Sequence, residues 1–143
     1  MCTRLHNNEV IIAKEDIPCF KIVKKELHRK NRYNTYFQFA HITLNEVKFA
    51  DGFEIKKNYN SSRLSYPFII EKGLHSFRSY YYAVDTLKFL EPHDTNYKIL
   101  KGIIPKGSRY VKGSFFRNND AYVSNAEMYT EVYDPQLKLE FQK

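Results

Sequence analysis

Residues 76–90 read SFRSYYYAVDTLKFL and contain the most regular hydrophobic pattern in the chain. Apolar side chains that recur every three or four residues lie on one face of a helix. Ser76 or Ser79 is a suitable N-cap for this helix, and Pro92 ends it. The members of the apolar stripe are Phe77, Tyr80, Tyr81, Val84, Leu87 and Leu90. The pattern therefore predicts one amphipathic helix that buries this stripe.

The segments on either side of the helix are typical of short β-strands, because they are rich in β-branched and aromatic residues. A hairpin is predicted over residues 47–59, with Asp51-Gly52 as its turn. The other predicted strands are 17–23, 33–40, 66–71, 74–77, 97–104, 109–111, 121–133 and 137–141. One helix among many strands indicates a strand-rich α+β domain, with the helix packed on an antiparallel sheet.

The length of 143 residues is that of one domain, so we expect residues 1–143 to share a single core. No apolar run is long enough for a signal peptide or a membrane helix. The two cysteines, Cys2 and Cys19, form no CxxC pair and cannot make a disulfide framework. We therefore expect a cytoplasmic protein in a reducing compartment.

The net charge of +7 is unevenly distributed along the chain. Lys and Arg residues are concentrated in residues 21–32 and 96–117, whereas the C-terminal part is acidic. Such a distribution favours a basic face that binds an acidic partner, either a protein or a nucleic acid. Surface lysines that only maintain solubility are an equally good explanation. The candidate basic patch consists of Lys21, Lys24, Lys25, Arg29, Lys106 and Arg109.

Known catalytic and metal-binding patterns are missing from the sequence. Cys2, His6, Cys19 and His28 do not have the spacing of a zinc site, so no metal is expected. The five glycines form neither a phosphate-binding loop nor a dinucleotide fingerprint. No nucleophile elbow is present either.

The junction between the strand 74–77 and the helix is the best candidate for a ligand site. Backbone N–H groups are free at the start of a helix, and three polar side chains lie beside them. These candidates are His75, Ser76 and Arg78. A histidine packed in the core with one satisfied ring nitrogen is the alternative explanation for His75.

Arg78 is followed by three tyrosines at 80–82, an arrangement of cation and rings found in binding sites for single-stranded nucleic acid. Adjacent helical residues point about 100° apart, so the rings cannot form one platform. We expect two of the three to belong to the core.

Four stretches of the chain resemble small uncharacterised proteins of gut bacteria and their phages. These stretches are DIPCFKIV (16–23), EKGLHSF (71–77), IIPKGSRY (103–110) and AYVSN (121–125). They are spread over most of the length of the chain, from residue 16 to residue 125, and the resemblance implies no particular activity.

The order Gly73-Leu74-His75-Ser76-Phe77, Ala83 and a strand running toward Gly107 is similar to that of the ADP-ribosyltransferase fold, in its poly(ADP-ribose) polymerase-like branch. The resemblance implies NAD as ligand and places His75 where a tyrosine stacks on the nicotinamide. It also implies a histidine in the first strand, which residues 19–23 lack. The family's catalytic glutamate is missing near residues 121–123, where Asp120 or Glu127 would have to replace it.

Two functional interpretations follow. In the first, the chain is a small, basic, non-enzymatic binding protein of phage or mobile-element type that acts on an acidic partner and needs no cofactor. In the second, it is an ADP-ribosyltransferase-like domain that binds NAD or a related nucleotide and is either active or catalytically degenerate.

Overall fold

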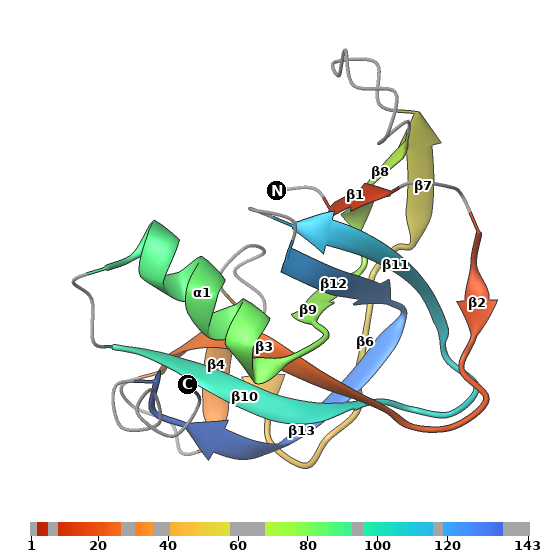
Figure 1. Cartoon of the computed structure of the whole chain (residues 1–143). Helices are drawn as coiled ribbons and strands as arrows, with labels where there is room; N and C mark the ends of the chain where they lie inside the picture. Colours follow the sequence, from red (N-terminus) through yellow and green to blue (C-terminus); the bar gives the residue numbers. More distant parts are fainter. Residues whose placement is uncertain are drawn as a thin grey trace.

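The computed structural model describes residues 3–5, 9–26, 31–35, 41–57, 68–92, 96–115 and 119–135 (Figure 1). One helix, α1 (Tyr80–Leu90), lies among these residues. The strands are β1 (Thr3–Leu5), β2 (Ile11–Ile12), β3 (Ile17–Lys25), β4 (Arg32–Thr35), β5 (His41–Thr43), β6 (Lys48–Phe49), β7 (Glu54–Lys57), β8 (Phe68–Lys72), β9 (Leu74–Phe77), β10 (Tyr97–Ile104), β11 (Arg109–Phe115), β12 (Asn119–Ser124) and β13 (Ala126–Tyr133).

The expected α+β class is wrong, because strands dominate the described part of the chain. All 13 strands belong to one antiparallel sheet, and the single helix has only 11 residues. No helix among the described residues is long and apolar enough to cross a membrane. The helix covers only part of one face, and the sheet buries the remaining apolar side chains by curling on itself. The fold is therefore mostly β.

Two long strands, each bent at one residue, close the sheet into two rings. Gly73 alone separates β8 from β9, and Asn125 alone separates β12 from β13. The first ring runs through β9, β12–β13, β10 and β3, and returns to β9. The second runs through β9, β12, β11 and β1, and returns through β8. The pairing of β9 with β12 belongs to both rings.

Gly73 is required at the first bend. Its φ of +133° lies in a region that L side chains rarely adopt, and a Cβ atom there would lie 2.4 Å from Cγ1 of Val123. The bend brings β8 beside β1 while β9 remains beside β12. A glycine at this position thus allows one strand to belong to both parts of the sheet.

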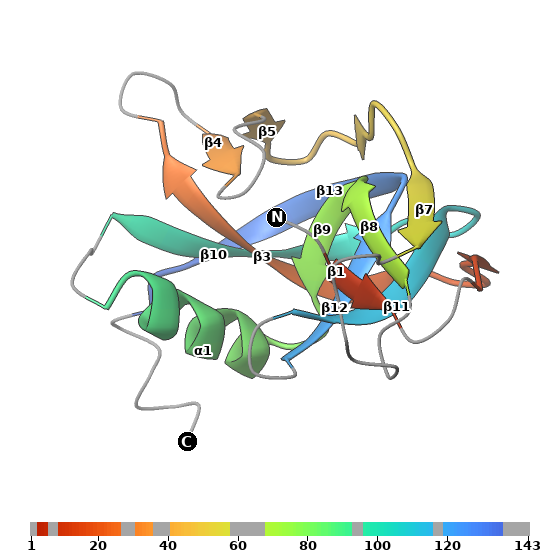
Figure 2. The ribbon, with the colours of Figure 1, turned by 90° about the horizontal axis from the view of Figure 1, so that it is seen from above.

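Three apolar clusters fill the fold. The second ring encloses Leu5, Ile70, Val111 and Val123, one from each of β1, β8, β11 and β12. Figure 2 shows α1 on one side of β3 and β10, with β4 and β5 on the opposite side. The helix side buries Ile22, Phe77, Tyr80, Ala83, Val84, Leu87, Ile99, Phe115 and Ala121. The opposite side buries Ala13, Cys19, Val23, Tyr33, Ile42, Leu100, Ile104, Tyr110, Tyr122 and Tyr129.

The predicted helix exists but begins later than expected. Ser79 is its N-cap and accepts a hydrogen bond from the backbone N–H of Tyr82, whereas Ser76 lies in β9. Tyr80 is buried, but Tyr81 is 61% exposed, so its place in the apolar stripe was wrong. Two of the three tyrosines at 80–82 do contribute to the core, as predicted, since Tyr80 is buried and the half-buried Tyr82 packs against the same cluster.

The predicted hairpin over residues 47–59 is wrong as well. Asp51-Gly52 does not join two paired strands, because β6 pairs with β13 and β7 pairs with β8. The predicted strand 97–104 is confirmed as β10, and that at 17–23 as part of β3. The predicted strand 137–141 and residues 36–40 lie outside the described residues.

Val84 tests the packing of α1 on the sheet. This side chain is 5% exposed and lies in the cluster between α1 and the sheet. We expect Val84→Asp to lower the free energy of unfolding by about 3 kcal/mol or more, because it buries an unpaired charge. Urea denaturation measures the change. Phe89→Asp, at a helical position that is 52% exposed, should cost far less; equal losses would contradict the packing.

Candidate functional site

The predicted basic patch does not form one surface. Lys21 is 5% exposed, so its assignment to the patch was wrong. Lys24 and Lys25 are exposed where β3 pairs with the start of β10, whereas Lys106 and Arg109 are exposed beyond the other end of β10. The eight residues of β10 lie between these two groups, and their seven steps correspond to roughly 23 Å. Arg29, the remaining candidate, lies outside the described residues.

Lys21 instead belongs to a buried chain of polar groups in the first ring. Its ammonium lies 2.5 Å from Oε1 of Glu127, a residue with no exposed surface. The Tyr129 hydroxyl donates to Oε2 of the same carboxylate over 3.0 Å. The Cys19 thiol donates to the Tyr129 hydroxyl over 3.4 Å. The lysine therefore neutralises a carboxylate that would otherwise be an unpaired buried charge.

The buried chain is not built to supply a nucleophile. Burial raises the pKa of the Cys19 thiol to about 12, and the negative charge of Glu127 adds to the effect. Burial also raises the pKa of Tyr129 well above its usual value. A thiol attacks as the thiolate, which is scarcely populated at neutral pH when the pKa is so high. These four buried side chains therefore stabilise the fold and do not supply a nucleophile.

Removing one partner of the buried ion pair should destabilise the protein strongly. We expect Lys21→Met to cost about 3–5 kcal/mol of unfolding free energy, because it leaves the Glu127 carboxylate buried without a counter-charge. The double variant Lys21→Met/Glu127→Gln should recover most of the loss. Chemical denaturation tests both variants, with Lys24→Met as an exposed control that changes stability little. No recovery in the double variant would contradict the pairing.

His75 is placed as a packed histidine rather than as a ligand-binding one. It lies in β9, with Nδ1 3.2 Å from the Gly73 carbonyl oxygen and Nε2 3.4 Å from that of Ile70. Burial lowers the pKa of His75 from 6.5 to about 4, and the charge of Lys21 adds to this effect. Ser76, the second candidate, is 2% exposed. Neither lines the two cavities described below.

The depressed pKa of His75 makes stability depend on pH. Because the folded protein binds this proton less readily, His75 destabilises the fold as the pH falls from 6.5 toward 4. We expect the advantage of wild type over His75→Gln to shrink by up to about 3 kcal/mol over that interval. Urea denaturation of both proteins at several pH values measures it. A difference that is independent of pH would show that the imidazole is not buried as described.

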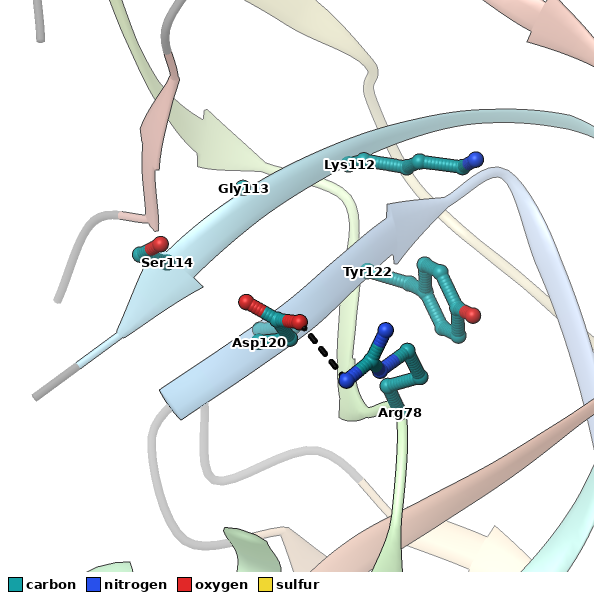
Figure 3. A pocket seen from close by; sticks show the side chains of 7 residues that line it. Arg78, Lys112, Gly113, Ser114, Asp120 and Tyr122 are labelled. Carbon is teal, nitrogen blue, oxygen red and sulfur yellow. Dashed lines mark ion pairs between the residues drawn. The ribbon is translucent and has the colours of Figure 1, made fainter. Parts of the chain in front are cut away.

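Arg78, the third candidate, lines a surface cavity of about 360 Å³, called here the Arg78–Lys112 cavity (Figure 3). Arg78 follows β9, and the other contributions come from β11 and β12. Figure 3 shows the ring of Tyr122 between the side chains of Arg78 and Lys112. The lining residues are Arg78, Lys112, Gly113, Ser114, Asp120, Ala121 and Tyr122.

Arg78 is oriented by two partners at the edge of this cavity. Its Nη2 lies 2.9 Å from Oδ2 of Asp120 and donates over 3.1 Å to the hydroxyl of Tyr82. The guanidinium also lies 5.4 Å from the centre of the Tyr82 ring. The hydrogen bond to Tyr82 and the charge of Asp120 raise the pKa of Arg78. The pair with Asp120 is half-exposed, so an incoming anion can compete for the guanidinium.

Lys112 is the functional candidate that the sequence reasoning missed. It is exposed on β11 directly opposite Tyr122 of β12, and no described residue pairs with its ammonium. The Tyr122 ring is fixed by an edge-to-face contact with Tyr110, at a centroid distance of 5.8 Å. Lys112 lies within the basic segment 96–117, but its neighbour across the sheet was not visible in the sequence.

A second cavity, of about 380 Å³, lies beside β7. The guanidinium carbon of Arg109 is 5.6 Å from the ring centre of Phe53 there. The lining residues are Val10, Phe53, Glu54, Ile55, Lys57, Phe68 and Arg109. Glu54 adds an exposed carboxylate to this lining.

No group of three or more potential metal ligands occurs among the described residues. The comparisons with protein families, with curated proteins and with solved structures returned no match for this chain. The two resemblances drawn from the sequence therefore stay predictions. Two suggested roles rest on those resemblances alone. These are His75 in an NAD site and Asp120 or Glu127 as a catalytic carboxylate.

Proposed function

We propose that this chain is a non-enzymatic binding protein of phage or mobile-element type, acting in the host cytoplasm, and that its acidic ligand occupies the Arg78–Lys112 cavity. The observation that carries the proposal is the pair of cations on either side of Tyr122, one of which, Lys112, has no partner among the described residues. An unused cation beside a fixed ring attracts an anionic ligand with an apolar or aromatic portion.

The chemistry of the cavity favours a phosphate group. Arg78 offers a planar fork of N–H donors, and Lys112 offers a point charge from the other side of the ring. The Ser114 hydroxyl adds a neutral donor on the same strand face as Lys112. Asp120 balances one of the two positive charges, so a ligand must displace it from Arg78. Singly charged anions should therefore bind poorly, and doubly charged phosphate should bind more tightly than they do.

The buried thiol and carboxylate of the first ring do not line the cavity, and neither favours catalysis. The thiol with a pKa of about 12 is buried, and the buried carboxylate of Glu127 is occupied by Lys21. The NAD-binding interpretation has no such supporting geometry, because His75 lies beside backbone carbonyl groups. Binding of NAD would nevertheless place its pyrophosphate in the Arg78–Lys112 cavity, since the cations are there.

Calorimetric titration at low salt tests the proposal with inorganic phosphate and with a nucleoside monophosphate. We expect both to bind wild type, and Lys112→Glu to weaken binding at least about tenfold, since it replaces an attraction with a repulsion. Arg78→Gln should also weaken binding, because it removes the positive charge. The glutamine amide can still donate a hydrogen bond toward the Tyr82 hydroxyl.

Lys14→Glu is the matched control. Lys14 is exposed and does not line the cavity, and its substitution changes the net charge by the same amount as Lys112→Glu. This control should bind the ligands like wild type. If Lys14→Glu and Lys112→Glu lower the affinity equally, the loss comes from the change in net charge. That result would contradict a defined site. No heat of binding at millimolar phosphate or nucleotide would contradict the proposal itself.

A further inference from the structure

We infer that the ligand is a single strand of nucleic acid, which passes from the Arg78–Lys112 cavity across the outer face of the second ring. This inference rests on the proposed function and names its ligand class. It is carried by two features outside the cavity: a row of side chains that the strand register places on the outside of the second ring, and the exposed ring of Tyr81, which contacts Tyr82.

The row follows from the pairing of five strands. Asp120 of β12 is opposite Ser114 of β11, and Ser114 is opposite Arg4 of β1. Arg4 is in turn opposite Ile69 of β8, which is opposite Lys56 of β7. Residues that are directly opposite in antiparallel strands point to the same face of the sheet. The row therefore continues from the cavity wall to the exposed Lys56.

This face is the outer one. Leu5 and Ile70, the neighbours of Arg4 and Ile69 along their strands, are buried inside the second ring, so the alternating positions point outward. Four spacings of about 4.8 Å separate β12 from β7, so the row is roughly 19 Å long when it is followed along the curved outside of the ring. A DNA strand carries one charge per about 3.4 Å of helix axis, so several phosphates fit along this length.

The cations are distributed over the whole row rather than gathered at one end. Arg78 and Lys112 lie at the cavity, Arg4 lies in the middle, and Lys56 lies at the far edge. A mononucleotide in the cavity reaches only the first two. A linear polyanion reaches all four, and proteins that bind single strands likewise use a series of cations along the backbone.

The aromatic pair distinguishes a nucleic acid from an acidic polypeptide. Tyr81 is 61% exposed, and its ring centre lies 6.0 Å from that of Tyr82, whose own ring lies 5.4 Å from the guanidinium of Arg78. An exposed ring stacks with an unpaired base, and bases inside a duplex do not offer their faces. The combination of a cation row with an exposed ring at its end thus favours a single strand.

The test measures binding of a fluorescent 12-nucleotide oligothymidylate to the full chain by anisotropy, beside thymidine monophosphate and inorganic phosphate by calorimetry. We expect the oligonucleotide to bind more tightly than the monophosphate, with a log–log salt slope of about −2.8 for four contacts on a single strand. Lys56→Glu should weaken oligonucleotide binding about tenfold and leave phosphate binding unchanged. Tyr81→Ala should do the same, and Lys14→Glu should do neither.

The two proposals fail in different ways. If phosphate binding depends on Lys112 but the oligonucleotide binds no more tightly than the monophosphate, this inference is wrong. The proposed anion site in the cavity would then still stand. Insensitivity to both Lys56→Glu and Tyr81→Ala would overturn the inference as well, as would equal affinity for a duplex or for polyglutamate. If no ligand binds at low salt, both the proposed anion site and the inference of a nucleic-acid ligand are wrong.

Discussion

The pairing of β9 with β12 is the contact on which the rest of the structure depends, because both rings of the sheet contain it. Its register places Tyr122 opposite Ser76 on one face and Val123 opposite His75 on the other. The bends at Gly73 and Asn125 then carry the same two strands into different parts of the sheet. A slip of one residue in this pairing would turn every side chain of one of the two strands to the wrong face.

The same pairing builds the Arg78–Lys112 cavity. The backbone N–H of Arg78 donates over 3.1 Å to the carbonyl of Asp120, which continues the β9–β12 ladder by one bond before α1 begins. That bond brings the guanidinium next to the Asp120 carboxylate and beside Tyr122. The site is thus fixed by main-chain hydrogen bonds, and its charged side chains remain half-exposed and available to a ligand.

Local patterns in the sequence predicted some elements and left others open. The apolar, β-branched run at 97–104 is followed by a Pro-Lys-Gly turn, so β10 follows from the sequence, whereas the start of α1 was left between Ser76 and Ser79. The Asp51-Gly52 hairpin failed because β6 pairs with β13 and β7 pairs with β8, and no local pattern around Asp51 reveals these partners.

The parts of the site that depend on distant residues could not be predicted in this way. Lys21 reads as a surface cation until Glu127, 106 residues away, is placed beside it. Lys112 becomes a candidate only when Tyr122 and Arg78 are its neighbours. Titration of ¹⁵N-labelled protein with a short oligothymidylate would test the central claim most directly. The account predicts that the largest amide shifts occur at residues 78, 112 and 122; shifts confined to Lys24 and Lys25, or to the surroundings of Arg109, would contradict it.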